Sequence, residues 1–263
     1  MNERSLVAFT LLAQMAVGAF LTLGALDVWA GGLTGQPSAQ ALTNSALLAI
    51  GPAIAAALLA SLLHLGTPGN AWRALANLRS SWLSREILFA LAFAGLGGLF
   101  AALRWSGASS PALRSLVALA AGLCGVALVY AMARVYRLRT VRSWDTPLTT
   151  VSFFATALLL GSLGVGTGLV LLPGVPDALV TGPLRAIAVV ATACCGIEVA
   201  ANGGGTLHGI RRLLLLVGLA LCVALLLGAG RATALVVPAF GVALAAQVLG
   251  RYLFYLTGLA RSL

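Results

Sequence analysis

Long uninterrupted runs of apolar residues occupy most of this chain, and their length restricts the fold more than any other feature of the sequence. An α-helix needs about 20 predominantly apolar residues to cross the hydrocarbon core of a bilayer. We expect eight transmembrane helices, over residues 5–26, 42–63, 85–104, 113–136, 149–172, 183–202, 212–229 and 233–256. Because the runs are continuous and do not alternate in polarity, they predict an all-α helical bundle and not a β-barrel.

The composition agrees with a membrane protein that has little chain outside the bilayer. Only 8% of the 263 residues are charged, against about 25% in soluble domains. Eight helices of about 20 residues leave roughly 100 residues for loops and tails, so residues 1–263 are expected to form a single polytopic membrane domain. The first run is too long for a cleaved signal peptide, which predicts a retained helix. An echo between LHLG at 63–66 and LHG at 207–209 is compatible with two four-helix halves, although chance also explains it.

The positive charge is distributed unequally between the two ends of the expected bundle. All sixteen basic residues are arginine and the net charge is +10, but the chain lacks the soluble basic face of a nucleic-acid-binding protein. Arginines at the end where the chain starts are Arg4, Arg73, Arg79, Arg85, Arg134, Arg137, Arg139, Arg142, Arg211, Arg212, Arg251 and Arg261, and those at the other end are Arg104, Arg114, Arg185 and Arg231. The positive-inside rule then places both termini in the cytoplasm. The same bias would suit docking of an acidic partner subunit.

The cysteines and histidines do not form a recognisable set of metal ligands. Cys124, Cys194, Cys195 and Cys222 lie inside apolar runs, without the C-x-x-C spacing of zinc or iron–sulfur sites. His64 ends the second run, and His208 lies in NGGGTLHGIRR, which is predicted to be a loop. A pair of axial histidines could therefore form only once, in an awkward place. We expect no haem and no metal in this chain.

Several polar residues lie inside or at the ends of the apolar runs, where they are costly and therefore candidates for function. They are Gln14, His64, Glu86, Arg134, Glu198, Asn202 and Arg251. All except Gln14 are predicted to lie near the end of the bundle where the chain starts. His64 and Glu86 are separated by a 21-residue loop, whose pattern of Trp72, Leu75, Leu78 and Trp82 predicts a short segment along the membrane surface.

Two classes of function fit these polar residues. Quinol oxidation needs an apolar slot, hydrogen-bond partners for two hydroxyl groups, and a base for each proton. A histidine, with an ordinary pKa near 6.5, and a carboxylate at the lipid–water boundary supply such groups. A proton-coupled small-molecule transporter could use the same pair. Arg134, Arg251 and Glu198 could also form a buried ion-pair network with a structural role only.

Three ordered motifs carry a family resemblance: SLLHLGTPGNAWRALANLRSSWLSREI at 61–87, MARVYRLRTVRSWDTP at 132–147 and GRYLFY at 250–255. The most specific is H-L-G-[ST]-P followed by N-x-x-x-S-x-x-S-x-E, matched by His64 to Pro68 and then by Asn77, Ser81, Ser84 and Glu86. The chain resembles the DmsC family, the membrane anchor subunits of dimethyl sulfoxide reductase-type molybdoenzymes. It is more distantly similar to NrfD and polysulfide reductase anchors.

The resemblance implies an anchor in the bacterial cytoplasmic membrane that binds menaquinone or ubiquinone. Quinone binding and proton acceptance fall on His64 and Glu86, with Arg134 and Tyr136 of the R-V-Y element and Arg251 of the G-R element as further candidates. A ferredoxin-like subunit with several [4Fe–4S] clusters would dock on Arg73, Arg79, Arg137, Arg139 and Arg142, and a catalytic subunit with molybdopterin guanine dinucleotide would lie beyond it. The direction of electron flow, as in a sulfoxide reductase or a sulfite dehydrogenase, stays open. A structural anchor that has lost its quinone site is a third alternative.

Overall fold

Seven long helices make up nearly all of the described residues in a computed structural model, which describes residues 3–29, 56, 77–106, 110–138, 140–141, 144–171, 177–201, 205–228 and 230–259. They are α1 (Glu3–Trp29), α4 (Trp82–Ser106), α5 (Pro111–Tyr136), α6 (Pro147–Leu171), α7 (Asp177–Ala200), α8 (Thr206–Leu227) and α9 (Val236–Leu259). A short 3-10 helix, η4 (Gly230–Leu235), precedes α9. Each long helix is apolar over a length sufficient to cross a membrane. The protein is an all-α, multi-pass membrane protein.

The predicted runs match these helices closely, except at two starting points. The run expected at 42–63 lies, except for residue 56, outside the described residues. Helix α7 begins at Asp177 and α8 at Thr206, before the expected starts at 183 and 212. The prediction that His208 lies in a loop is therefore wrong, because it belongs to the first turn of α8. Hydropathy detects the part of a helix that faces hydrocarbon, whereas the backbone continues helical where polar side chains reach water.

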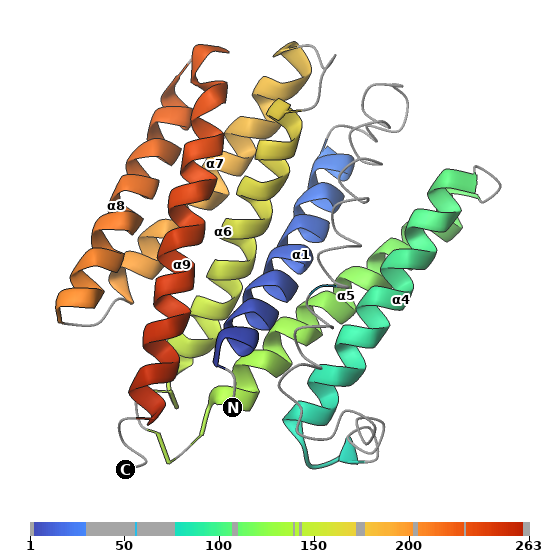
Figure 1. The fold of residues 1–263 in the computed structure, drawn as a ribbon. Helices are drawn as coiled ribbons and strands as arrows, with labels where there is room; N and C mark the ends of the chain where they lie inside the picture. Colours follow the sequence, from blue (N-terminus) through green and yellow to red (C-terminus); the bar gives the residue numbers. More distant parts are fainter. Residues whose placement is uncertain are drawn as a thin grey trace.

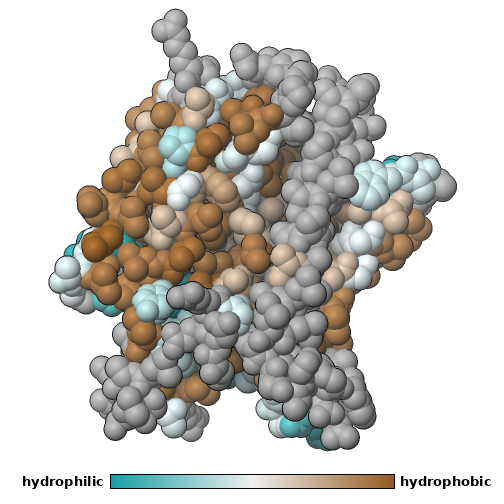
Figure 2. All heavy atoms as spheres, viewed as in Figure 1, coloured by the Kyte–Doolittle hydropathy of each residue, from teal (hydrophilic) through white to brown (hydrophobic). Residues whose placement is uncertain are grey.

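Helices α1 and α6 form the centre of the bundle (Figure 1). They contribute to both clusters of buried apolar side chains. One cluster joins them to α7, α8 and α9, for example through Leu160 and Ile187. The other joins them to α4 and α5, where Phe20 of α1 meets Phe93 of α4 edge to face, with ring centroids 5.5 Å apart. Figure 2 shows apolar side chains over the flank where α8 and α9 lie, as expected for a surface that faces lipid.

One end of the bundle, which we name the N-terminal face, carries most of the arginines of the described helices. Helices α1, α4, α6 and α8 begin there, and α5, α7 and α9 end there, at the lower side of Figure 1. Arginines in or next to the helix turns at this face are Arg79, Arg85, Arg134, Arg137, Arg211, Arg212 and Arg251, whereas Arg104, Arg114, Arg185 and Arg231 belong to the opposite end. The unequal charge predicted from the sequence is confirmed for these residues.

The crossing of α1 over α6 depends on two glycines that face each other. A Cβ atom at Gly161 would lie 2.2 Å from the backbone nitrogen of Ala19, and one at Gly18 would lie 1.8 Å from the carbonyl oxygen of Ala157. These separations are far below van der Waals contact. The two backbones approach so closely because neither helix carries a side chain there, as is common where membrane helices pack.

Replacing Gly161 with valine is expected to separate α1 from α6 and to destabilise the fold by about 1–3 kcal/mol, the usual range for overpacking a core. Gly168→Val is the matched control, because a Cβ atom at Gly168 of the same helix meets nothing within 4 Å. Thermal unfolding of both variants in detergent measures the difference. Equal midpoints for the two variants would contradict the close crossing.

Candidate functional site

Glu86 is buried at the N-terminal face although it carries a carboxyl group. It lies one turn into α4 and is only 3% exposed. It shares the inward face of α4 with Ala90 and Phe93, because residues three and four apart lie on one side of a helix. Among the described residues, none forms an ion pair with Glu86, and its electrostatic neighbours are the phenols of Tyr136 and Tyr255. An unpaired carboxyl group in such surroundings is suited to exchanging a proton.

Tyr136 of α5 has both Glu86 of α4 and Tyr255 of α9 as electrostatic neighbours. It is the last residue of α5, and its ring centroid lies 5.3 Å from that of Tyr255 on α9. The Tyr255 hydroxyl donates to Oγ1 of Thr10 on α1 at 3.5 Å. Thr10 itself donates to the carbonyl oxygen of Leu6 at 3.0 Å, which leaves its lone pairs to accept. The phenols are thereby held in a buried polar cluster that three helices build.

Arg251 lies at the centre of this cluster and is only 5% exposed. Its Nη2 donates to Oε1 of Gln14 at 2.9 Å. Its guanidinium carbon lies 3.6 Å from the centroid of the Phe153 ring, in a cation–π contact. Tyr136 and Tyr255 are among its electrostatic neighbours. The structure therefore brings together Glu86, Tyr136 and Arg251 of the predicted site.

Arg134 is placed differently from Tyr136, although only one residue separates them. Its guanidinium carbon lies 5.0 Å from the centroid of the Trp82 ring at the start of α4. Residues two apart point to different sides of a helix, so Arg134 turns toward α4 and Tyr136 turns into the bundle. Trp82 also receives Arg85 at 4.3 Å and contacts the ring of Tyr130. Trp82 is expected from the sequence to end a segment along the membrane surface, but it is the first residue of α4. Its ring contacts the guanidinium groups of Arg85 and Arg134.

Glu198 does not pair with Arg134 or Arg251, and the hypothesis of that ion-pair network is wrong. The Glu198 carboxylate accepts from Nη2 of Arg211 on α8 and from the Ser152 hydroxyl at 2.6 Å. Room for the Arg211 guanidinium depends on Gly250 of α9, since a Cβ atom there would lie 2.4 Å from Nε. The pair was missed because Arg211 was assigned to a loop end, whereas it lies inside α8.

Only some of the remaining predicted site residues belong to the part of the chain that the structure describes. His64, Arg73, Arg139, Arg142 and Asn202 lie outside the described residues. Arg79 is exposed at the N-terminal face, and Arg137 forms an ion pair with Asp145 at 3.4 Å. The described residues include no group of three or more His, Cys, Asp or Glu side chains able to hold a metal. Cys194, Cys195 and Cys222 are buried, and Cys124 is half-buried.

A stripe of polar residues on α9 could have predicted the members of the cluster that sequence reasoning missed. Gln247, Arg251 and Tyr255 follow one another at intervals of four along an otherwise apolar helix. Thr10 and Gln14 repeat the same spacing on α1. Such a spacing places polar groups on one face, and in a membrane helix that face turns toward protein and not toward lipid.

Comparison with known proteins identifies the family. The model of a family described as DMSO reductase anchor subunit (DmsC) matches residues 1–212. The chain belongs to this family. One relative, a component of the anaerobic dimethyl sulfoxide reductase of Escherichia coli K12, is 32% identical to it over 275 aligned positions, which cover 97% of this chain and 94% of that protein. Another anaerobic dimethyl sulfoxide reductase component of the same organism, YnfH, is 31% identical, and the match covers 75% of this chain and 68% of that protein.

This DmsC-family protein also has a more partial likeness to a protein of another name. One of the subunits of a sulfite dehydrogenase from Allochromatium vinosum is 35% identical over 105 residues, which cover 36% of this chain and 32% of that protein. The predicted family resemblance is confirmed, and the protein is a member of a family of membrane anchors.

Proposed function

We propose that this protein is the membrane anchor and quinone-binding subunit of a molybdenum/iron–sulfur oxidoreductase, and that it exchanges electrons between the quinone pool and a docked iron–sulfur subunit. Membership of the DmsC family supports the anchor role. The observation that carries the quinone role is the buried Glu86 carboxyl group beside Tyr136 and Tyr255 at the arginine-rich face. The enzyme type is a sulfoxide reductase or a sulfite dehydrogenase, the activities named for the relatives.

The proposed site divides the work between its residues. Glu86 accepts a proton from a quinol hydroxyl, or returns one to the quinone when electrons flow the other way. His64 is proposed as the second acceptor, on the strength of the motif alone. Tyr136 is proposed to line the quinone-binding site on the side of α5. Arg251, an electrostatic neighbour of Tyr136, supplies positive charge to the site. Arg134, held against Trp82, is proposed to lie at the edge of the site.

We propose that electron exchange involves partner subunits, as membership of the DmsC anchor-subunit family supports. We propose a ferredoxin-like subunit with [4Fe–4S] clusters at the N-terminal face and a molybdopterin guanine dinucleotide subunit beyond it. The proposed docking residues are Arg73, Arg79, Arg137, Arg139 and Arg142. Quinone then exchanges electrons with a cluster of the partner, and this protein holds the ligand and moves the protons.

The eight-span plan is part of the proposal. Helices α1 and α4 both run from the N-terminal face to the opposite face, which supports a further crossing of the bilayer between them. The apolar run at 42–63 has the length for that passage. Residues 1–263 then form one membrane domain in the bacterial cytoplasmic membrane, with both termini and the N-terminal face in the cytoplasm, as the arginine distribution favours.

The proposed function is tested by gentle extraction of the protein with its natural partners, metal analysis, and EPR of the iron–sulfur clusters. We expect iron and molybdenum to co-purify, and the cluster signals to respond to added menaquinol or ubiquinone. A metal-free preparation under conditions that preserve membrane complexes, together with substrate uptake by the isolated protein in liposomes, would instead indicate a proton-coupled transporter.

The docking face gives a second test. Arg79→Glu is expected to weaken co-purification of the iron–sulfur subunit, and increasingly so at higher salt, because charges at the rim of an interface steer association. Arg114→Glu is the control, since Arg114 lies in the first turn of α5 at the opposite end of the bundle. Pull-down from membranes over a salt series measures the effect. Equal loss in both variants, or in neither, would argue against docking at this face.

A further inference from the structure

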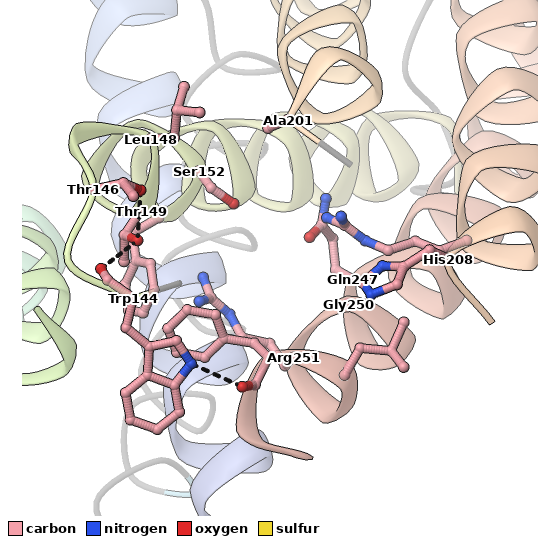
Figure 3. A pocket seen from close by; sticks show the side chains of 14 residues that line it. Trp144, Thr146, Leu148, Thr149, Ser152, Ala201, His208, Gln247, Gly250 and Arg251 are labelled. Carbon is pink, nitrogen blue, oxygen red and sulfur yellow. Dashed lines mark hydrogen bonds between the residues drawn. The ribbon is translucent and has the colours of Figure 1, made fainter. Parts of the chain in front are cut away.

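A cavity of about 350 Å³ lies at the N-terminal face between α6, α8 and α9 (Figure 3). Its polar lining includes Ser152, His208, Arg211, Gln247 and Arg251. The residue Glu86 does not line it. Figure 3 shows Ser152, Gln247 and Arg251 pointing from different sides toward a common space. Arg251 therefore lies between this cavity and the proposed quinone site, and the other four residues take no part in that site.

The cavity contains buried donors that the described protein does not satisfy. Gln247 is 2% exposed, and its Oε1 accepts from the Thr156 hydroxyl at 3.1 Å. Its Nε2 has no hydrogen-bond partner among the described residues, and neither has Nε of Arg251. An unmade buried hydrogen bond is costly. Two such donors at one cavity indicate a ligand that brings acceptor oxygens.

The charge of the cavity indicates that the ligand is an anion. The charge of Arg211 is balanced by Glu198, with which it forms an ion pair. Arg251 forms no ion pair among the described residues, and Glu198 is an electrostatic neighbour of both arginines. Two guanidinium groups thus share one carboxylate, which leaves one positive charge in excess. Helices α6 and α8 both begin at this face, and the N-terminal end of a helix adds partial positive charge.

We propose that this cavity binds the phosphate group of an anionic phospholipid. A phosphate offers several acceptor oxygens and a negative charge to the guanidinium and amide groups. Leu148, on the rim at the start of α6, is 57% exposed, which gives the acyl chains a way to the bilayer. Basic pockets between membrane helices on the cytoplasmic side bind anionic head groups in this manner. A carboxylate from a docked protein is the competing occupant.

The test compares lipids on the full complex after delipidation in detergent. Phosphatidylglycerol is expected to raise the thermal midpoint of the wild-type complex, and phosphatidylcholine is not. Gln247→Glu is expected to weaken phosphatidylglycerol binding by about tenfold or more, because it replaces a donor with a repelling carboxylate. Thr156→Val is the matched control, since it removes the hydrogen bond to Gln247 but leaves the Nε2 donor in place.

A second variant at the same position distinguishes weaker lipid binding from misfolding. Gln247→Met removes the donor without adding charge, and we expect it to weaken binding less than Gln247→Glu while the complex stays assembled. Equal stabilisation by both lipids, or unchanged phosphatidylglycerol affinity in both Gln247 variants, would overturn the proposal. Equal stabilisation by inorganic phosphate alone would overturn the assignment to a lipid. A stabilisation that requires the docked subunit and no lipid would assign the cavity to a protein carboxylate and overturn it as well.

Discussion

Replacing Glu86 with glutamine in the assembled complex is expected to lower quinol-dependent turnover by about 100-fold or more, the lower end of what a positioned acid or base contributes. Glutamine keeps the shape of the buried side chain but cannot accept a proton at neutral pH. Activity of the soluble subunits with an artificial electron donor should stay at the wild-type level, since that route bypasses the membrane site. Steady-state assays with both donors on the same membranes measure the two activities.

Arg104→Gln is the control for the loss of a charged side chain, because Arg104 belongs to the last turn of the same helix, α4, at the opposite end of the bundle. It should leave both activities unchanged. Equal loss of both activities in Glu86→Gln would indicate failed assembly and not a lost proton acceptor. Wild-type turnover with quinol, in this variant and in His64→Gln, would contradict the proposed proton-accepting roles and leave these two residues a structural role only.

Replacing Glu198 with glutamine is expected to destabilise the protein by about 3–5 kcal/mol, because it leaves the buried guanidinium of Arg211 without its counter-charge. Glu198 is fully buried and Arg211 nearly so. A second substitution, Arg211→Met in the Glu198→Gln background, should restore most of the loss, since no uncompensated charge then remains. Thermal unfolding of the single and double variants in detergent measures both effects.

The ion pair between Arg137 and Asp145 gives the matched comparison. Its side chains are 24% and 32% exposed, and pairs in contact with water contribute about 1 kcal/mol or less. Arg137→Gln should therefore shift the unfolding midpoint far less than Glu198→Gln. Equal shifts, or no rescue in the double variant, would contradict the role of burial.

Most of the fold could be predicted because hydropathy records which segments the lipid can accept. Seven of the expected runs coincide with helices, and the errors lie at the starts of α7 and α8. There the helix continues past the hydrocarbon into polar residues such as His208 and Arg211. A hydropathy window does not separate such a turn from a loop, and glycines just before it, as in NGGGTLHG, also favour a loop.

The candidate site could be predicted as a set of residues but not as a set of contacts. Burial of Glu86 and Arg251 follows from their place in apolar helices. The pairing of Arg251 with Gln14 joins residues 237 positions apart, and no local spacing specifies it. The same holds for Glu198, whose partner Arg211 is only 13 positions away but on another helix. Helical periodicity tells which face a residue occupies, and the packing of helices decides what that face meets.

The central position of α1 affects how the protein is made. Proteins insert from the N-terminus during synthesis, so the first helix enters the bilayer long before α6 and α9 exist. Until then Gln14 and Thr10 lack the arginine and the tyrosine that they contact in the finished bundle, and the surface of α1 at Gly18 lacks the helix that covers it. Folding of the membrane domain is therefore completed only when the last helix arrives, and loss of that helix would leave the first one with exposed polar groups in lipid.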